Sequence, residues 1–205
     1  MRYPSTVSDL LLSILIVITT EAYIWLLATQ ARWTVVIPVA LVGLLWRRQS
    51  QTPASLGLRF SSFVLSLRQW YVLWILSTAL FLFLGRHVIF NTSILLRGCL
   101  YFIWCTLQQL LYQSVIWAVV RKRLASRWTA ALVSGLVFAS LHIPNPVLIP
   151  GTLLWGVFSS LLFENCRSVI GLALLQVMLS SMLMWVTPYH LHRGFRTGPS
   201  YYRVP

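Results

Sequence analysis

Long apolar runs separated by short polar or basic connectors make up almost the whole chain. A helix needs about 20 apolar residues to cross the ~30 Å hydrocarbon core, and backbone groups in lipid must be hydrogen-bonded within the protein, so these runs predict spanning helices. The predicted spans are residues 8–29, 33–47, 69–86, 98–120, 129–143, 147–164 and 168–187. The predicted fold class is therefore all-α, a polytopic integral membrane helical bundle of about seven transmembrane helices.

Two predicted spans, 33–47 and 129–143, are short for a full crossing and would need little tilt, shielding by neighbours or an extra turn. The polar connector that ends at Arg59 is followed by Phe60 to Leu67, which predicts a short amphipathic helix at the membrane interface. Residues 1–205 show neither an internal repeat nor a soluble domain, and the 188–205 tail is too short to fold alone. A single membrane domain is predicted.

Composition supports a membrane protein and narrows its partners. Hydrophobic residues make up 58% of the chain and charged residues 9%, with a mean hydropathy of +0.78, which excludes an ordinary soluble domain. The net charge is +13, but the basic residues form short clusters between apolar runs and no continuous stripe, so no nucleic-acid partner is expected. The lipid bilayer is the expected partner, with arginines holding loops at anionic headgroups.

The basic residues also predict an orientation. If all seven spans cross, ten of them share the N-terminal side: Arg2, Arg47, Arg48, Arg59, Arg68, Arg121, Lys122, Arg123, Arg127 and Arg167. The other six lie opposite: Arg32, Arg86, Arg97, Arg193, Arg196 and Arg203. This excess predicts a cytoplasmic N terminus in a bacterial-type inner or plasma membrane.

Polar side chains at membrane depth concentrate in three of the predicted spans. They are Gln108, Gln109, Tyr112 and Gln113 in the fourth, His142 at the end of the fifth, and Gln176 and Ser180 in the seventh; Phe138 precedes His142 by one turn, and Asn145 follows it. Several pairs stand four residues apart and so share one helix face, which predicts one shared interior pocket. Taken singly, each glutamine could instead be a packing contact, stabilising the bundle by about 0.6 kcal/mol.

Other candidate groups are weaker. Glu21 is the carboxylate well inside an apolar run, and its simplest interpretation is a protonated acid bonded to neighbouring hydroxyls. The cysteines Cys99, Cys105 and Cys166 are odd in number and have no CxxC spacing, so neither a disulfide nor a metal site is indicated.

The order and spacing of these motifs, from about Thr52 to Ser180, resemble the CPBP family of intramembrane proteases, the CAAX-processing and bacteriocin-processing group. Leu56-Gly57-Leu58-Arg59 resembles the family's connector, and Phe138-Ala-Ser-Leu-His142 matches its Phe-x-x-x-His motif. The family's Glu-Glu-x-x-x-Arg is replaced by Gln108-Gln109-x-x-x-Gln113, and its His-x-x-x-Asn by Gln176-x-x-x-Ser180. The resemblance implies a CPBP-like core over residues 52–180, with the catalytic motifs degenerate.

In the family, the glutamates and histidines are thought to activate water for attack on a peptide bond, so these substitutions change what the site can do. An amide at Gln108 or Gln109 cannot accept a proton near neutral pH. Neutral amides and one histidine are also a poor donor set for a divalent ion, so no catalytic metal and no cofactor are expected. Without the acids, an arginine at position 113 would be an unpaired buried charge costing about 2.5–3.5 kcal/mol.

Two functional hypotheses follow, with a third outside this family. The first is a catalytically silent relative whose pocket binds a membrane protein or complex, or a prenyl-lipid or pigment ligand. Its predicted pocket residues are Gln108, Gln109, Tyr112, Gln113, His142, Asn145 and Gln176. The second is an active CAAX-type endopeptidase in which His142 works with a non-family acid such as Glu21, within about 3 Å or through one water. A small transporter or channel subunit is the third, although paired broken helices and a charged pore ring are not evident.

Overall fold

The computed structural model describes residues 7–27, 31–88 and 92–203, and within these ranges the chain is helix and loop without a strand. The N-terminal half contains α1 (Val7–Ala22), its π-helical end η1 (Tyr23–Leu27), η2 (Arg32–Val35), α2 (Val36–Arg48), α3 (Phe60–Gln69), α4 (Tyr71–Leu84) and η3 (Gly85–His87). The C-terminal half contains α5 (Thr92–Leu111), η4 (Tyr112–Trp117), α6 (Ala118–Arg123), α7 (Arg127–Ser140), α8 (Leu148–Cys166), α9 (Val169–Val186), α10 (Tyr189–His192), η5 (Arg193–Phe195) and η6 (Gly198–Tyr201). The all-helical prediction is confirmed for the described residues.

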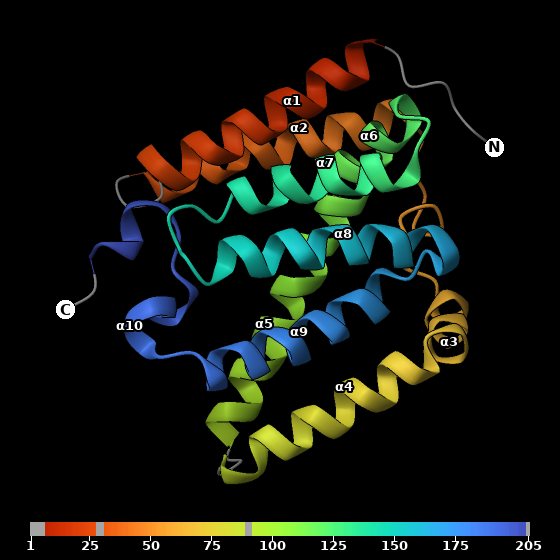
Figure 1. The fold of residues 1–205 in the computed structure, drawn as a ribbon. Helices are drawn as coiled ribbons and strands as arrows, with labels where there is room; N and C mark the ends of the chain where they lie inside the picture. Colours follow the sequence, from red (N-terminus) through yellow and green to blue (C-terminus); the bar gives the residue numbers. More distant parts are fainter. Residues whose placement is uncertain (1–6, 28–30, 89–91, 204–205) are drawn as a thin grey trace.

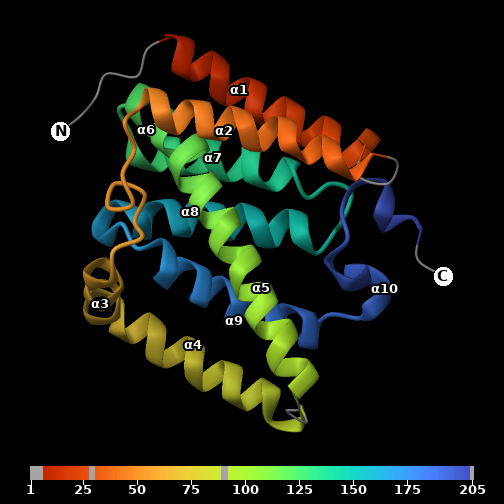
Figure 2. The ribbon, with the colours of Figure 1, turned by 180° about the vertical axis from the view of Figure 1, so that it is seen from behind.

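The helices form a layered bundle crossed by one long helix. In Figure 1, α1 and α2 lie together on one side, followed by α7, α8, α9 and α4. Figure 2 shows α5 running diagonally in front of α9 and α8 towards α6. The combined helix Thr92–Arg123 is 32 residues long, so it reaches every layer of the bundle.

Among the described residues, three helices are long and apolar enough to cross a membrane: Val7–Leu26, Thr92–Arg123 and Val169–Val186. A fourth crossing is available if α3 and α4, which meet at an angle of 84°, count as one broken span. The chain is thus a polytopic helical membrane protein, while seven full crossings stay a prediction. The short segments predicted at 33–47 and 129–143 form α2 and α7, of 13 and 14 residues. The first predicted span, 8–29, ends at residues 28 and 29, which lie outside the described residues.

Two glycines allow α7 and α8 to approach closely. A Cβ added at Gly156 would lie 2.8 Å from Gly135 Cα, and one added at Gly135 would lie 2.9 Å from the Leu153 carbonyl oxygen. Small residues are the usual means by which membrane helices bring their backbones into contact. This packing places the motif that ends α7 beside the middle of α8.

The connector at Leu56–Arg59 docks on the turn between α8 and α9. Gly57 has φ +81°, and its carbonyl accepts a hydrogen bond of 3.0 Å from the Val169 amide. A Cβ at Gly57 would lie 2.6 Å from the Arg167 carbonyl oxygen, so only glycine fits. The helix predicted over Phe60 to Leu67 is confirmed as α3, and the sharp bend to α4 fits a short helix lying at the interface.

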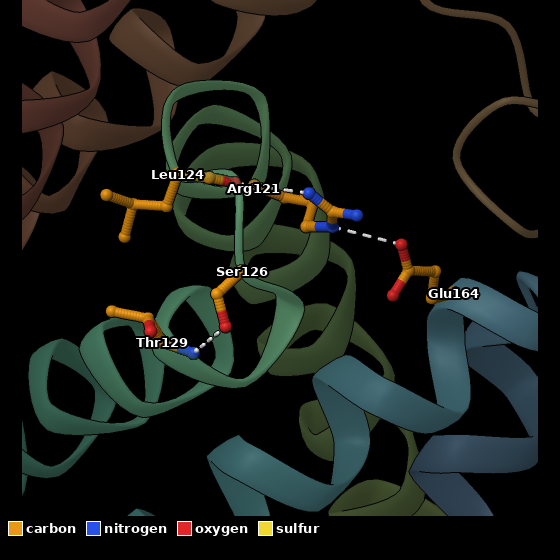
Figure 3. Close-up of polar contacts among 5 residues, drawn as sticks. All are labelled: Arg121, Leu124, Ser126, Thr129 and Glu164. Atoms are coloured by element: carbon orange, nitrogen blue, oxygen red, sulfur yellow. Dashed lines mark hydrogen bonds and ion pairs between the residues drawn. The ribbon is translucent and has the colours of Figure 1, made fainter.

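Figure 3 shows the turn between α6 and α7, at the end of the bundle where α1 begins. Ser126 Oγ accepts a hydrogen bond of 3.3 Å from the Thr129 amide and so caps α7. Arg121 donates to the Leu124 carbonyl at 3.2 Å and to the Glu164 carboxylate at 3.0 Å. These contacts tie α6 to the end of α8.

Candidate functional site

Four glutamines from two helices form one chain of side-chain amides inside the bundle. Gln113 Nε2 donates to Gln109 Oε1 at 3.1 Å, and Gln109 Nε2 donates to Gln176 Oε1 at 2.6 Å. Gln176 Nε2 in turn donates to Gln108 Oε1 at 2.9 Å. Three of the four side chains are buried, and Gln108 is half-buried. The predicted meeting of the fourth and seventh spans at their polar faces is present in the structure.

The amide chain stands where the long helix changes its geometry. Gln108 and Gln109 lie in the last turns of α5, and Gln113 lies in η4, where the chain becomes a π-helix. A π-helical turn frequently marks a functional position because it re-aims side chains that a regular helix would place elsewhere. All six residues of η4 are buried, so the irregular turn lies in the packed interior.

Trp155 completes the polar network through a hydrogen bond that was not anticipated from the sequence. Its indole Nε1 donates to Gln176 Oε1 at 3.1 Å, so that oxygen accepts two hydrogen bonds. Trp46 makes a comparable contact with the residue after Gln113: its indole Nε1 donates to Ser114 Oγ at 2.9 Å. A tryptophan in an apolar run gives no periodic signal that distinguishes a bonded indole from a packed one, so sequence reasoning could not have found either.

One atom of the network stays without a partner. Gln113 is 1% exposed, and among the described residues its Oε1 has no hydrogen-bond donor. An unpaired buried oxygen costs about 1–3 kcal/mol, so this position suits a donor group that arrives from outside the described chain.

A second cluster joins Tyr112 to α8 and α7. The Tyr112 hydroxyl lies 2.8 Å from both the Gly156 carbonyl oxygen and Ser160 Oγ. Its ring packs against Phe138 with centroids 4.7 Å apart, and Phe138 meets the His142 ring edge-on at 4.9 Å. The aromatic side chains thus connect the long helix to the motif at the end of α7.

His142 lies beyond the last turn of α7, and its ring nitrogen Nδ1 is hydrogen-bonded to the backbone of that helix. Its Nδ1 is 2.8 Å from the Phe138 carbonyl oxygen, and the residue is 8% exposed. No described hydrogen bond joins His142 to any of the four glutamines. The structure therefore brings Gln108, Gln109, Gln113 and Gln176 together and connects His142 to them through Phe138 and Tyr112.

Asn145 serves the chain's own backbone. Its Oδ1 accepts from the Val147 and Leu148 amides at 3.1 Å, which caps α8, and its Nδ2 donates to the carbonyls of His192 at 2.8 Å and Arg196 at 3.0 Å. The Gly198 amide adds a bond of 2.8 Å to the Ile143 carbonyl. The predicted pocket residue Asn145 thus anchors the C-terminal tail against the loop that carries His142.

Ser180 and Glu21 lie at the edges of this region. Ser180 Oγ donates to the Gln176 carbonyl and accepts from Tyr101 at 2.9 Å. Glu21 has side-chain hydrogen bonds with Ser140 and Trp25. The acid therefore reaches the end of α7, two residues before His142, and its described partners are a hydroxyl and an indole.

The donor set does not fit a divalent catalytic metal. The clustered groups are neutral amides, hydroxyls and indoles, whereas such ions prefer carboxylates, thiolates or several imidazoles. Within the described ranges, no group of three His, Cys, Asp or Glu residues could hold a metal ion.

Helices long enough to span lipid, arranged around a buried and uncharged polar network, define a polytopic membrane protein with an interior site. Residues 90–182 match the sequence model of a protein family described as type II CAAX prenyl endopeptidase Rce1-like. This segment contains the amide chain and the Phe138 to His142 motif, and its similarity to that family agrees with the predicted CPBP resemblance. The match begins after the Leu56–Arg59 connector. Neither the curated proteins nor the solved structures contain a match to the chain.

Proposed function

We propose that this chain is an Rce1-like membrane protein that does not hydrolyse peptides and instead binds a membrane partner at the amide chain. One observation carries the proposal: the positions at which the family resemblance expects Glu, Glu, Arg and His are Gln108, Gln109, Gln113 and Gln176, and their side chains bond to one another. The four substitutions form one self-consistent neutral network.

Chemistry supports the loss of hydrolysis. A general base must take a proton from water, and an amide side chain cannot do this near neutral pH. Gln109 and Gln176 each use both their amide oxygen and their amide nitrogen within the network, so a water that bonded these groups would have to compete with an existing hydrogen bond. Polar side chains that hydrogen-bond one another in a low-dielectric interior are held rigidly, which suits a structural or binding role.

The same network supports binding of an uncharged polar group. Gln108 is half-buried at one end of the amide chain, and Gln113 Oε1 lacks a donor at the other. A peptide N–H or a lipid hydroxyl can supply that donor without bringing a charge into the membrane. A segment of another membrane protein, or a prenyl-lipid or pigment ligand, can carry such an uncharged hydrogen-bond donor.

Copurification tests the binding role. The chain extracted in a mild detergent should retain a membrane protein or a neutral lipid, identified by mass spectrometry. Gln109→Leu, which interrupts the amide chain at its centre, should lose the bound molecule. Gln51→Leu, in the connector after α2, is the matched control and should keep it. Equal retention in both variants contradicts binding at the amide chain.

A second candidate is supported by the position of Glu21, whose bond to Ser140 brings a carboxyl group to the helix that ends beside His142. In that case Glu21 and His142 would activate water outside the family motif. The substitution Glu21→Gln distinguishes the endopeptidase role from the binding role. It would abolish cleavage if the chain is an endopeptidase, and it would leave the copurified molecule bound if the chain is a binding protein.

A further inference from the structure

An apolar groove lies between α1, the long helix and α7, and none of the four glutamines of the amide chain lines it. It has a volume of about 160 Å³. Its walls are formed by Leu10, Ser13, Ile14, Val17 and Ile18 of α1, by Val115, Ile116, Val119 and Val120 of η4 and α6, and by Val137 of α7. Nearly all of its lining is hydrocarbon, so an occupant must itself be apolar within the groove.

One wall residue is polar and unsatisfied. Ser13 is 6% exposed, and its hydroxyl has no hydrogen-bond partner among the described residues. It lies one helical turn from Asp9, towards the middle of α1. An occupant with an acceptor at this depth would satisfy the hydroxyl.

Cationic residues follow the groove-lining residues of α6 directly in the chain. Lys122 and Arg123 follow Val119 by three and four residues, so they lie on the same face of α6, one turn beyond the groove, and both are exposed. Arg48 reaches the same end of the bundle from α2, with its Nη2 donating to Ser8 Oγ at 2.8 Å. The acid Asp9 faces Arg48 at 3.9 Å, which leaves the net charge of this end positive.

We infer that the groove binds one acyl chain of an anionic phospholipid, with the phosphate held at Lys122 and Arg123. The combination of an apolar channel and a positive end matches the two halves of such a lipid, and the glycerol ester provides an acceptor at the depth of Ser13. A helix of a partner protein would fill the groove but would leave the cationic end unmatched. This inference rests on the groove and is independent of the proposed role of the amide chain.

Native mass spectrometry of the full chain tests this inference. The protein is reconstituted in phosphatidylcholine vesicles with and without phosphatidylglycerol, then released in a mild detergent. One phosphatidylglycerol should remain bound. Lys122→Gln together with Arg123→Gln should weaken its retention by about fivefold for each charge removed. The double variant Arg196→Gln with Arg203→Gln, at the opposite end, is the control and should retain it fully.

A second pair of variants tests the groove itself. Ile14→Trp fills the groove from its rim and should abolish retention, whereas Leu11→Trp adds the same bulk to an exposed position of α1 outside the groove and should not. Ser13→Leu narrows the groove from its wall and serves as a second filling variant if Ile14→Trp alters folding. Retention unchanged by both fillers overturns the inference, as does release of a copurified protein in place of lipid.

Discussion

At the scale of single residues, Gln109 and Gln176 are the two inner members of the buried network, because each both donates and accepts a hydrogen bond within it. Gln109 Nε2 bonds Gln176 and Gln109 Oε1 accepts from Gln113, and Gln109 is fully buried. Gln108, by contrast, provides a terminal acceptor and is half-buried. The two neighbouring glutamines therefore differ in how much of the network depends on them.

Replacement of Gln109 by leucine should destabilise the protein more than the same replacement of Gln108. The first change leaves Nε2 of Gln113, which is 1% exposed, without an acceptor and also removes a donor to Gln176 Oε1, at a cost of about 1–3 kcal/mol for a buried group; the second leaves only Nε2 of Gln176, which is 8% exposed, without its acceptor. Unfolding in mixed detergent micelles, followed by tryptophan fluorescence, measures the difference. Equal losses in the two variants would show that the amides act as independent contacts.

Sequence reasoning located these residues but not their arrangement. The i, i+4 spacing of Gln109 and Gln113 and the position of Gln176 predicted facing polar surfaces, which the structure contains. The π-helical turn at η4 follows from tertiary packing and has no pattern of its own in the sequence. Which amide donates to which also depends on distances between helices, so the closed chain could not be predicted.

At the scale of elements, the contact between α7 and α8 holds the motif at His142 beside the tyrosine cluster. Gly135 and Gly156 face each other across this contact, and the Tyr112 hydroxyl bonds the Gly156 carbonyl. Loss of the close approach would move both the Phe138 ring and its tyrosine partner.

Gly156→Ala should lower the thermal midpoint of the purified protein, because its new Cβ would lie 2.8 Å from Gly135 Cα and push the helices apart. The control is Gly43→Ala in α2, where a Cβ meets nothing within 4 Å and alanine favours the helix by about 0.5–1 kcal/mol. A thermal shift assay in detergent compares the two. Similar midpoints for both variants would contradict close packing of α7 on α8.

The C-terminal tail is an element whose docking the sequence did not reveal. A run of residues too short to fold alone still packs when a neighbouring side chain supplies its hydrogen bonds, as Asn145 does for His192 and Arg196. His192 is itself buried, and its Nδ1 accepts from the Gly194 amide at 3.0 Å. Burial lowers the pKa of His192 below its usual range.

Docking of the tail should therefore depend on pH. The docked state holds neutral His192 and binds fewer protons than the released tail, so docking is fully present above the usual histidine pKa of about 6.5 and weakens as the pH falls below it. Hydrogen–deuterium exchange of residues 189–203 at a series of pH values measures this. His192→Gln should remove the dependence, and His190→Gln, at an exposed position, should keep it. Uniform protection of the wild-type tail at every pH would contradict the prediction.

At the scale of the whole molecule, the long apolar runs were sufficient to predict the fold class and the order of the helices. Every predicted span corresponds to a helix of the structure, and the family resemblance is confirmed over residues 90–182. Helix length does not fix the number of full crossings. The helices α2 and α7 are too short to cross the bilayer as ordinary spans, but neighbouring helices can shield their ends from lipid. Apolar runs report that a segment avoids water, but not whether lipid or protein surrounds it.

The basic residues give the bundle a charge asymmetry that follows from its topology. The ends of α2 and α6 and the start of α7 lie at the end of the bundle where α1 begins, as Figures 1 and 2 show. Arg47, Arg48, Arg121, Lys122, Arg123 and Arg127 lie in these segments. We propose that this end faces the cytoplasm, in keeping with the excess of Lys and Arg found on that side of membrane proteins.

We propose that this chain, with four glutamines at its core and an Rce1-like match over residues 90–182, does not hydrolyse peptides. The most direct test is a cleavage assay with the purified wild-type chain in vesicles, using fluorogenic prenylated CAAX peptides and His142→Ala as the reference for background. Product formation by the wild type should equal that of His142→Ala. Turnover above background that both His142→Ala and Glu21→Gln abolish would contradict the account and establish an endopeptidase.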